Sequence, residues 1–373
     1  MKQTILYFQS TDKVSALQKL EGAYGHARAH GWDLQVIEPT VDERKAHELR
    51  RFWEPTGVIV ECGTERNHLD PAIFGGIPIV FLDRNPRTLR GRQFCVMHDS
   101  AATARLAAKE LLSLKLRSFA FVPWPEPRFW SHERENGFAE ALRLNGHDYA
   151  RFDVQGDGTD VLALQTQLER WLAGLPKPVG VFAANDRMAA RVLSAAGHIG
   201  IAVPNDLAVI GVDNDELLCE NTTPTLSSVM ADFTAAGRLA AEMLAGCIAG
   251  RHAKPRTATF GPLRIVRRAS TSRSARNDPD VLAACDIIRR RACDGLRARD
   301  VIALFSCSRR MAEIRFRKAT GHSILDEIQA HRLAKAETML RNATLDRNAI
   351  ANFCGYASGN ALMNFLRTAR TRH

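Results

Sequence analysis

The sequence predicts an α/β protein whose last hundred residues form a separate, all-helical domain. In the first 270 or so of the 373 residues, short apolar runs alternate with amphipathic helical patterns, which is typical of parallel sheets covered by helices. After Pro279 only helical patterns remain. Charge follows the same division, because 18 Lys/Arg and 10 Asp/Glu lie from Arg276 onward and supply +8 of the net +10. A chain of this length exceeds one ordinary core, so at least two domains are expected.

Seven short apolar runs are predicted strands. They are Ile5–Phe8, Leu34–Ile37, Val58–Val60, Ile79–Leu82, Phe119–Val122, Val179–Ala183 and Ala208–Val212. Amphipathic helices are predicted at Lys13–His30, Ala101–Leu114, Glu133–Asn145, Val161–Leu172 and Arg187–Ala196. The strands fall into two runs, one before about residue 100 and one after, which predicts two doubly wound lobes with a cleft between them. Ligands of such sheets bind at the carboxyl ends of the strands, so polar residues just after strands are the candidates for a site.

Three segments after strands carry such residues. Arg134 follows Phe129 and Trp130, and an arginine with a stacking aromatic ring suits a sugar or a carboxylate. The same residues would also fit a surface arginine beside core aromatics.

The second segment is Asn185-Asp186, of which one is expected only to cap the next helix. The third is Asp213-Asn214, whose carboxylate and amide are good partners for hydroxyl groups.

The segment from Arg267 to Asp280 is rich in Ser, Arg and Asn and has no apolar period, which predicts a linker. The expected domains are therefore 1–270, a linker at 271–280, and 281–373. The eight cysteines show no zinc or redox spacing, so we expect reduced thiols, no metal and no cofactor. The N-terminus lacks a signal peptide and no apolar stretch approaches the ~20 residues that span a bilayer, which predicts a cytoplasmic protein without a membrane partner.

Two helix-turn-helix patterns lie in series in the basic region, at Arg297–Lys318 and Leu345–Arg367, joined by a helix at Ile324–Arg341. A further helix at Val281–Arg291 opens the region. Small polar and basic residues begin each second helix, where a helix meets DNA. The predicted DNA-binding residues are Ser308, Arg309, Arg310, Glu313, Ser358, Gly359, Asn360 and Asn364. Some of these would contact only phosphate or solvent.

The turns of the two patterns differ. Gly355 suits the positive φ that the second turn requires. The first turn has Ser306 where glycine is usual, which is expected to cost some stability.

The run from Phe182 to Val229 resembles the effector domain of the lactose/galactose repressor family, as does the R-x-x-G-F pattern at Arg134, Gly137 and Phe138. This resemblance implies the two-lobed fold of periplasmic sugar-binding proteins, which closes on a small polar ligand. It implies that hydroxyl groups are bound by Arg134, Asp186, Asp213 and Asn214, with an aromatic ring near Trp130 against the sugar.

The basic region resembles the DNA-binding domain of the AraC/XylS family, and Ile350-Ala351, Gly355-Tyr356 and Leu366-Arg367 fall on its second unit. The family pattern continues with a closing helix, whereas this sequence stops at His373. We therefore expect a shortened second unit that is held less firmly.

A sensor of the first kind ahead of a DNA module of the second kind resembles the family of bacterial D-xylose operon activators. The resemblance covers nearly the whole chain. It implies a homodimer that binds a double-stranded operator, D-xylose or a related pentose as effector, and RNA polymerase as a further partner in activating pentose catabolism genes.

Two other hypotheses remain open at this point. An enzyme acting on sugars is disfavoured, because the sequence has no G-x-S-x-G, Walker or H-E-x-x-H motif and no catalytic residue can be named. A sugar-binding protein with DNA binding impaired by its short C-terminus differs from the regulator only in its affinity for DNA. The leading hypothesis is a sugar-responsive, DNA-binding transcription regulator without enzymatic activity.

Overall fold

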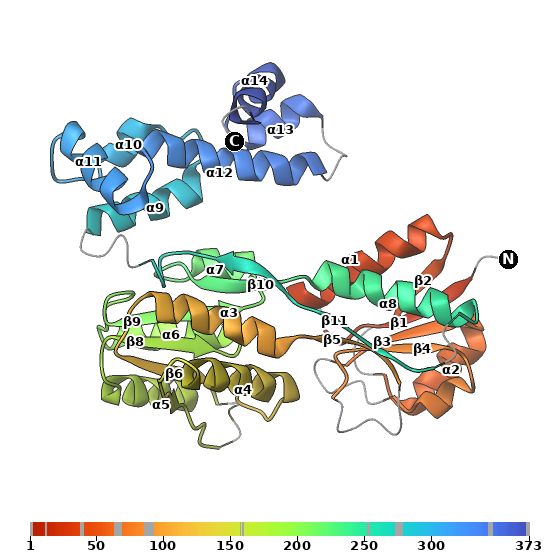
Figure 1. The fold of residues 1–373 in the computed structure, drawn as a ribbon. Helices are drawn as coiled ribbons and strands as arrows, with labels where there is room; N and C mark the ends of the chain where they lie inside the picture. The colour runs from red at the N-terminus through yellow and green to blue at the C-terminus, as the bar shows by residue number, and fades with distance from the viewer. Residues whose placement is uncertain are drawn as a thin grey trace. The chain divides into compact units, whose positions relative to one another are not determined.

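The computed structural model describes residues 3–11, 13–37, 41–62, 69–85, 93–156, 158, 160–251, 254–272, 279–341 and 346–370. The chain divides into two compact units between Thr271 and Ser272 (Figure 1). Among the described residues, the first unit contains two six-stranded sheets, and the second contains helices and no strand. Within the described residues no helix is both long and apolar enough to span a membrane.

The first sheet and its helices form what we call lobe 1. Its strands are β1 (Thr4–Phe8), β2 (Asp33–Ile37), β3 (Gly57–Glu61), β4 (Ile79–Leu82), β5 (Phe94–His98) and β11 (Thr257–Phe260). They lie in the order β11-β5-β4-β3-β1-β2 and all the described pairings are parallel. Helices α1 (Val14–Ala29) and α8 (Phe233–Ile248) lie side by side on one face (Figure 1). Helix α2 (Glu43–Trp53) and the short 3₁₀ helix η1 (Pro71–Phe74) pack on the other.

The apolar strands of lobe 1 follow from burial on both faces. Along β1, Ile5 and Tyr7 belong to the core under α1 and α8, whereas Leu6 and Phe8 belong to the core beside α2. All four side chains are buried. A strand covered on both faces reads as an unbroken apolar run, which is why these strands were visible in the sequence.

The second sheet and its helices form lobe 2. Its strands are β6 (Ser118–Val122), β7 (Ala150–Arg151), β8 (Val179–Ala183), β9 (Leu207–Val212), β10 (Ser227–Ala231) and β12 (Pro262–Val266). The order is β12-β10-β9-β8-β6-β7, and β12 runs antiparallel to β10 while the others are parallel. The helices are α3 (Ser100–Ser113), α4 (Phe129–Arg143), α5 (Val161–Gly174), α6 (Asp186–His198) and α7 (Glu216–Asn221). The core under α3 and α4 is distinct from the core under α5 and α6.

The two lobes have the same strand order, and the chain crosses between them three times. The chain leaves lobe 1 after β5, returns after β10 as α8 and β11, and leaves again into β12. The sequence placed the lobe boundary at about residue 100 and did not predict this return. Helices α8 and α1 pack closely at Gly237. A Cβ added there would lie only 1.7 Å from the carbonyl oxygen of Lys19, so the contact requires glycine.

The predicted two-lobed parallel α/β fold, followed by a helical region, is confirmed. The predicted linker, however, begins too early. Arg268, Ser270 and Thr271 are buried within lobe 2. Hydrogen bonds of the serine and threonine hydroxyls hold this segment in place, although it contains no apolar run. The predicted linker residues 273–278 lie outside the described residues.

The second unit consists of short helices around one long one. Its helices are α9 (Pro279–Arg291), α10 (Ala298–Ile302), α11 (Arg309–Thr320), α12 (Ile324–Arg341), α13 (Arg347–Phe353) and α14 (Gly359–Arg370). Ile324 and Ile328 of α12 enter the core that surrounds Phe316, whereas Ala336 enters the core that contains Leu362. The long helix therefore connects two small cores, one for each helix-turn-helix pattern.

The predicted turn chemistry is mostly confirmed. The Ser308 hydroxyl caps α11 by accepting a hydrogen bond from the backbone N–H of Met311, and Gly355 has a φ of 76°. Ser306, in contrast, does not adopt a positive φ and therefore carries no left-handed strain. Its N–H and hydroxyl both lie 3.4 Å from a carboxylate oxygen of Asp280. The eight cysteines form no disulfide.

Candidate functional site

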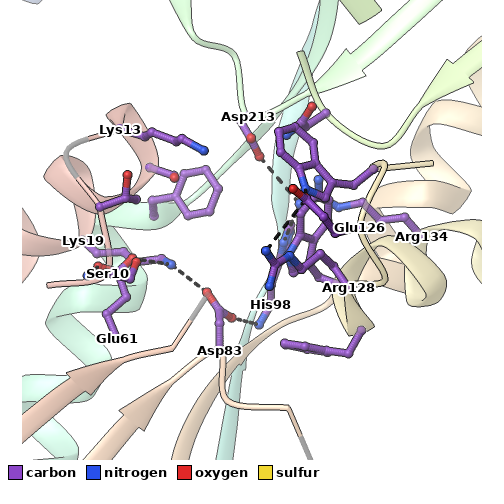
Figure 2. A pocket seen from close by; sticks show the side chains of 17 residues that line it. Ser10, Lys13, Lys19, Glu61, Asp83, His98, Glu126, Arg128, Arg134 and Asp213 are labelled. Carbon is purple, nitrogen blue, oxygen red and sulfur yellow. Dashed lines mark hydrogen bonds and ion pairs between the residues drawn. The ribbon is translucent and has the colours of Figure 1, made fainter. Parts of the chain in front are cut away.

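A cavity of about 320 Å³ lies in the first unit where the carboxyl ends of both sheets meet (Figure 2). This volume is at the lower end of the ~300–1,000 Å³ typical of small-molecule sites. The cavity is lined by Ser10, Thr11, Lys13, Ser15, Lys19, Glu61, Asp83, His98, Trp124, Glu126, Arg128, Phe129, Trp130, Arg134, Asn185, Asp213 and Phe233. Ser10, Glu61, Asp83 and His98 stand at or just after strand ends of lobe 1, and Asn185 and Asp213 do so in lobe 2. The position is the one that doubly wound sheets use for ligands.

The lobe 1 wall is built on a buried lysine held between two carboxylates. The Nζ of Lys19 lies 3.0 Å from Glu61 and 2.7 Å from Asp83, and Lys19 is only 4% exposed. Burial alone would lower the pKa of Lys19, but the charges of Asp83 and Glu61 outweigh it and the pKa is raised. Burial would likewise raise the pKa of Asp83, but Lys19 and His98 hold it below its ordinary value. Lys19 and Asp83 are therefore both charged at neutral pH.

His98 joins the two walls. Its Nδ1 lies 3.2 Å from the guanidinium of Arg134, and its Nε2 lies 2.9 Å from the hydroxyl of Thr103. Because arginine can only donate, Nδ1 is the acceptor and the proton of the neutral ring is on Nε2. Burial, followed by the charge of Arg134, lowers the pKa of His98 to about 3. The ring stacks on Phe260 at 4.9 Å and meets the edge of Phe233 at 5.9 Å.

These three rings mark the places where the chain passes between the lobes. His98 ends β5, Phe233 opens α8 and Phe260 ends β11, and each is within a few residues of a crossing. The ring cluster therefore packs the crossing segments together next to the cavity.

The lobe 2 wall centres on Arg134, which is 4% exposed. Its guanidinium donates to the carbonyl oxygen of Ala184, lies 3.6 Å from the Asp213 carboxylate and stacks over the Trp130 ring at 4.9 Å. Its Nε is buried and has no hydrogen-bond partner among the described residues. An unpartnered N–H on a buried cation is costly.

Asp213 and Asn185 complete this wall, as the sequence predicted for strand-end residues. Asp213 has a φ of 106°, and burial raises its pKa while the charge of Arg134 opposes the rise. Asn185 caps α6 by accepting from the N–H of Met188 at 3.1 Å, so the capping role falls to this residue of the Asn185-Asp186 pair.

Asp186 and Asn214 lie behind the wall and not in the lining. The carboxylate of Asp186 accepts from the hydroxyl of Ser228 at 2.6 Å and from the N–H of Asp215 at 2.9 Å. Burial, followed by the charge of Asp213, raises the pKa of Asp186. The side-chain oxygen of Asn214 accepts from Arg268 at 3.0 Å. Both side chains hold the turn that carries Asp213 and are already bonded within lobe 2.

Aromatic rings line the lobe 2 side of the cavity and reach its rim. Trp124 lies 6.2 Å from Trp130, and its indole N–H donates to Glu126. Lys13 sits over the Trp124 ring at 5.4 Å. Flat apolar faces beside polar groups suit a ligand with hydroxyls on its edge and C–H groups on its faces.

The sequence analysis missed the whole lobe 1 wall. Asp83 and His98 could have been found, because one directly follows a predicted strand and the other ends a short apolar run, Phe94–His98. Lys19 offered no comparable signal, because it lies within α1 and its partners are 42 and 64 residues away.

Among the described residues of the lining, the charges cancel. The four cationic side chains are Lys13, Lys19, Arg128 and Arg134, and the four anionic ones are Glu61, Asp83, Glu126 and Asp213. His98 adds no charge at neutral pH because its pKa is about 3. A cavity with paired charges favours a neutral polar ligand over a phosphate or a carboxylate.

In the second unit, the predicted DNA-binding residues of α11 separate into two groups. Arg309 and Arg310 are exposed, and beyond them Ile314 is 50% exposed. Glu313, in contrast, is half-buried, and its carboxylate lies 3.4 Å from the N–H of Ile324 at the start of α12. It is placed to support the next helix and is turned toward it.

The residues of α14 separate similarly. Ser358, Asn360 and Asn364 are exposed, and Ser358 accepts from the N–H of Ala361 at 3.2 Å. Gly359 is buried, and its N–H donates to the side chain of Asn348 at 2.9 Å.

Comparison with known proteins agrees with this architecture. Residues 108–271 match the family model described as periplasmic binding protein-like domain. The xylose operon regulatory protein of Haemophilus influenzae is 30% identical over 263 residues, which cover 70% of this chain and 68% of the relative. The protein of the same name from Escherichia coli K12 is 29% identical over 345 residues, 90% of this chain and 86% of the relative.

Among solved structures, one described as the xylose-binding transcription activator is 26% identical, with a TM-score of 0.61 over 99% of this chain and 96% of that one. The cellobiose complex of a transcriptional regulator covers 72% of this chain and 85% of the other at 21% identity and a TM-score of 0.61, which is a likeness of fold. These relatives favour the regulator over the enzyme among the hypotheses drawn from the sequence. The chain belongs to the family of the xylose operon regulatory proteins and is a transcription regulator controlled by a sugar.

Proposed function

We propose that the cavity binds D-xylose and that binding controls the grip of the helical unit on operator DNA. The observation that carries the proposal is a cavity whose described charges cancel, whose sides are aromatic and whose lining includes the buried guanidinium of Arg134. Such a cavity offers donors, acceptors and flat apolar faces without net charge, which are the requirements of a neutral sugar. The printed names of the relatives supply the choice of xylose among neutral sugars.

The two walls hold different parts of the sugar. On lobe 2, Arg134 donates to ring or hydroxyl oxygens, Asp213 accepts from hydroxyls, Asn185 adds an amide and Trp130 lies against the C–H face. On lobe 1, Lys19 and Asp83 offer a donor and an acceptor that are already oriented by their mutual contact at 2.7 Å. Asp186 and Asn214 support the turn that carries Asp213 and do not contact the sugar.

The helical unit binds double-stranded DNA through α11 and α14, as an AraC-type domain with two helix-turn-helix elements. Arg309 and Arg310 reach base edges or phosphates from α11, and Asn360 and Asn364 do so from α14. Ser308 and Ser358 cap the two helices at the DNA surface. The exposed Ile314 adds an apolar contact of the kind made with thymine methyl groups.

The regulator acts in the cytoplasm as a homodimer on two half-sites, and it activates genes for pentose catabolism through contact with RNA polymerase. Dimers of helix-turn-helix proteins require half-sites about one helical turn, roughly 34 Å, apart. A sugar that changes the spacing of two DNA-binding units therefore changes operator affinity steeply.

Calorimetry of the purified full chain against D-xylose, L-arabinose, D-ribose and D-glucose tests the ligand. D-Xylose should bind most tightly, and D-xylonate and D-xylose 5-phosphate should bind at least tenfold more weakly, since their charges would be buried without a partner. Equal affinity for the charged compounds would contradict the argument from the cavity. Selection of duplexes from a random-sequence pool, followed by binding at several salt concentrations, tests the DNA function.

A further inference from the structure

We infer that Asn214 and Arg268 transmit the state of the sugar cavity to the chain segment that leads into the DNA-binding unit. The inference rests on the proposed function and concerns the regulation of that site. It assigns to Asn214 a role different from sugar binding, because its side chain points to Arg268 and not into the cavity.

The two residues of the turn after β9 point in different directions. Asp213 and Asn214 are consecutive non-glycine residues with positive φ, 106° and 52°. Asp213 faces the cavity (Figure 2), whereas the Asn214 amide oxygen accepts from the guanidinium of Arg268 at 3.0 Å. Left-handed backbone is strained for side chains other than glycine, so the surrounding bonds must hold it in place. A ligand that pulls on Asp213 therefore displaces Asn214 through one shared, strained peptide unit.

Arg268 is the residue that receives this displacement. It is 3% exposed, and besides Asn214 its guanidinium binds the carbonyl oxygen of Leu226 at 2.9 Å and the carboxylate of Glu220. Its backbone N–H donates to the Ser227 hydroxyl at 2.7 Å. Arg268 is thus bonded through both its side chain and its backbone. A displacement of the guanidinium therefore passes to the backbone and is not absorbed by a loose side chain.

The next residues carry the shift to the end of the unit. The Ser270 hydroxyl donates to the carbonyl oxygen of Val209 at 2.6 Å, and the Thr271 hydroxyl donates to that of Ser227 at 2.7 Å. Ser270 and Thr271 are buried, and Thr271 is the last residue of the first unit. The chain then continues directly into the DNA-binding unit. Only three positions separate Arg268 from that boundary.

The experiment uses substitutions at Asn214 in the full chain. Asn214→Gly removes the amide but suits the left-handed backbone, and the turn keeps the hydrogen bond from the backbone N–H of residue 214 to the Ser228 hydroxyl at 3.0 Å. Asn214→Asp keeps an acceptor for Arg268 and tolerates the same backbone. Arg264→Ala is the matched control, because Arg264 lies four residues before Arg268 in β12 and its side chain is exposed. Each variant is checked by thermal melting.

Two affinities are measured for each protein. Calorimetry gives the affinity for D-xylose, and fluorescence anisotropy gives the affinity for a duplex selected by the wild-type chain, without and with saturating D-xylose. The ratio of the two DNA affinities is the coupling, which is typically about 5- to 150-fold in allosteric proteins. Asn214→Gly should keep the sugar affinity and the sugar-free DNA affinity within about threefold, while its coupling falls to nearly one. Asn214→Asp and Arg264→Ala should keep the wild-type coupling.

Wild-type coupling in Asn214→Gly would overturn the inference. So would a loss of sugar affinity of thirtyfold or more in a folded Asn214→Gly protein, because Asn214 would then belong to the sugar site. Failure of the wild-type chain to bind D-xylose would overturn only the proposed ligand, and the coupling would then be measured with whichever panel sugar binds. If no panel sugar changes the DNA affinity of the wild-type chain, no signal exists to transmit and the inference falls with the proposed function.

Discussion

Replacing Arg134 by alanine should abolish sugar binding while leaving sugar-free DNA binding intact. The guanidinium is the buried cation of the lobe 2 wall, and its Nε has no partner among the described residues. Its other N–H groups reach Ala184, His98 and Asp213.

The expected size of the effect follows from these contacts. A hydrogen bond that involves a charged group contributes about 1.5–3 kcal/mol. Two such bonds to the sugar correspond to roughly a 100-fold loss of affinity at the lower limit, since ~1.4 kcal/mol is a factor of ten. The substitution also leaves Asp213 without its cation. Because the Asp213 side chain is 25% exposed, the free energy of unfolding should fall by less than the ~3–5 kcal/mol that follows when a fully buried ion pair is broken.

Calorimetry with D-xylose and a melting curve on the same preparation measure both effects. Arg143→Ala is the control, because Arg143 is an exposed arginine in the last turn of the same helix, α4. Arg134→Lys should recover much of the stability but little of the sugar affinity, since an ammonium lacks the planar set of donors. An Arg134→Ala protein that binds D-xylose as tightly as the Arg143→Ala control would refute the assignment of the cavity.

Three further predictions concern other parts of the chain. The double substitution Arg309→Ala, Arg310→Ala should weaken binding to the selected duplex and lower the salt slope of the binding constant by about two if both contact phosphate, without changing calorimetry with D-xylose; a normal gel shift would count against it. Gly355→Ala should lower the stability of the second helix-turn-helix element by about 1–3 kcal/mol, because its φ is 76° and the new Cβ would lie 2.8 Å from the carbonyl oxygen of Cys293. Denaturant unfolding of the full chain, followed by DNA binding, would reveal it. The third prediction is a pH dependence: the unfolded chain protonates His98 near pH 6.5 but the folded chain does not until about pH 3, so stability is present above pH 6.5 and is lost as the pH falls. Between pH 7.5 and 5.5 this group should remove about 1.4 kcal/mol, and His98→Gln should flatten the measured profile by that amount.

The sequence predicted those elements whose burial leaves a pattern. Strands such as β1 and β8 are covered on both faces, so every residue is apolar and the run stands out. Strands β11 and β12 were missed because both lie at sheet edges and contain exposed residues, so neither reads as an unbroken apolar run. β11 pairs with β5 and β12 pairs with β10, and in each case the partner strand lies more than 30 residues earlier in the chain. No local sequence pattern encodes such pairing.

The candidate site shows the same limit. Asn185 and Asp213 could be predicted because each stands just after a strand end, and Arg134 because it lies in the segment that follows β6. The direction of the Asn214 side chain could not be predicted, since its φ of 52° removes the alternation that a strand would impose. Lys19 is a functional candidate only because the fold brings Glu61 and Asp83 to it.

The cavity walls also explain how a sugar could move the lobes at all. A ligand shifts an equilibrium only by the difference between its affinities for the two arrangements. Moving a population from 1:99 to 99:1 requires about 5.5 kcal/mol of such a difference. Contacts with Arg134 and Asp213 alone would not supply it, because lobe 2 offers them whether the lobes are near or far apart. Contacts with Lys19 and Asp83 differ, since a sugar held on lobe 2 reaches them only when lobe 1 is close. At about 1.5–3 kcal/mol for each hydrogen bond to a charged group, two to four such contacts are sufficient. The lobe 1 wall, which the sequence did not reveal, is therefore the part of the site that turns binding into a switch.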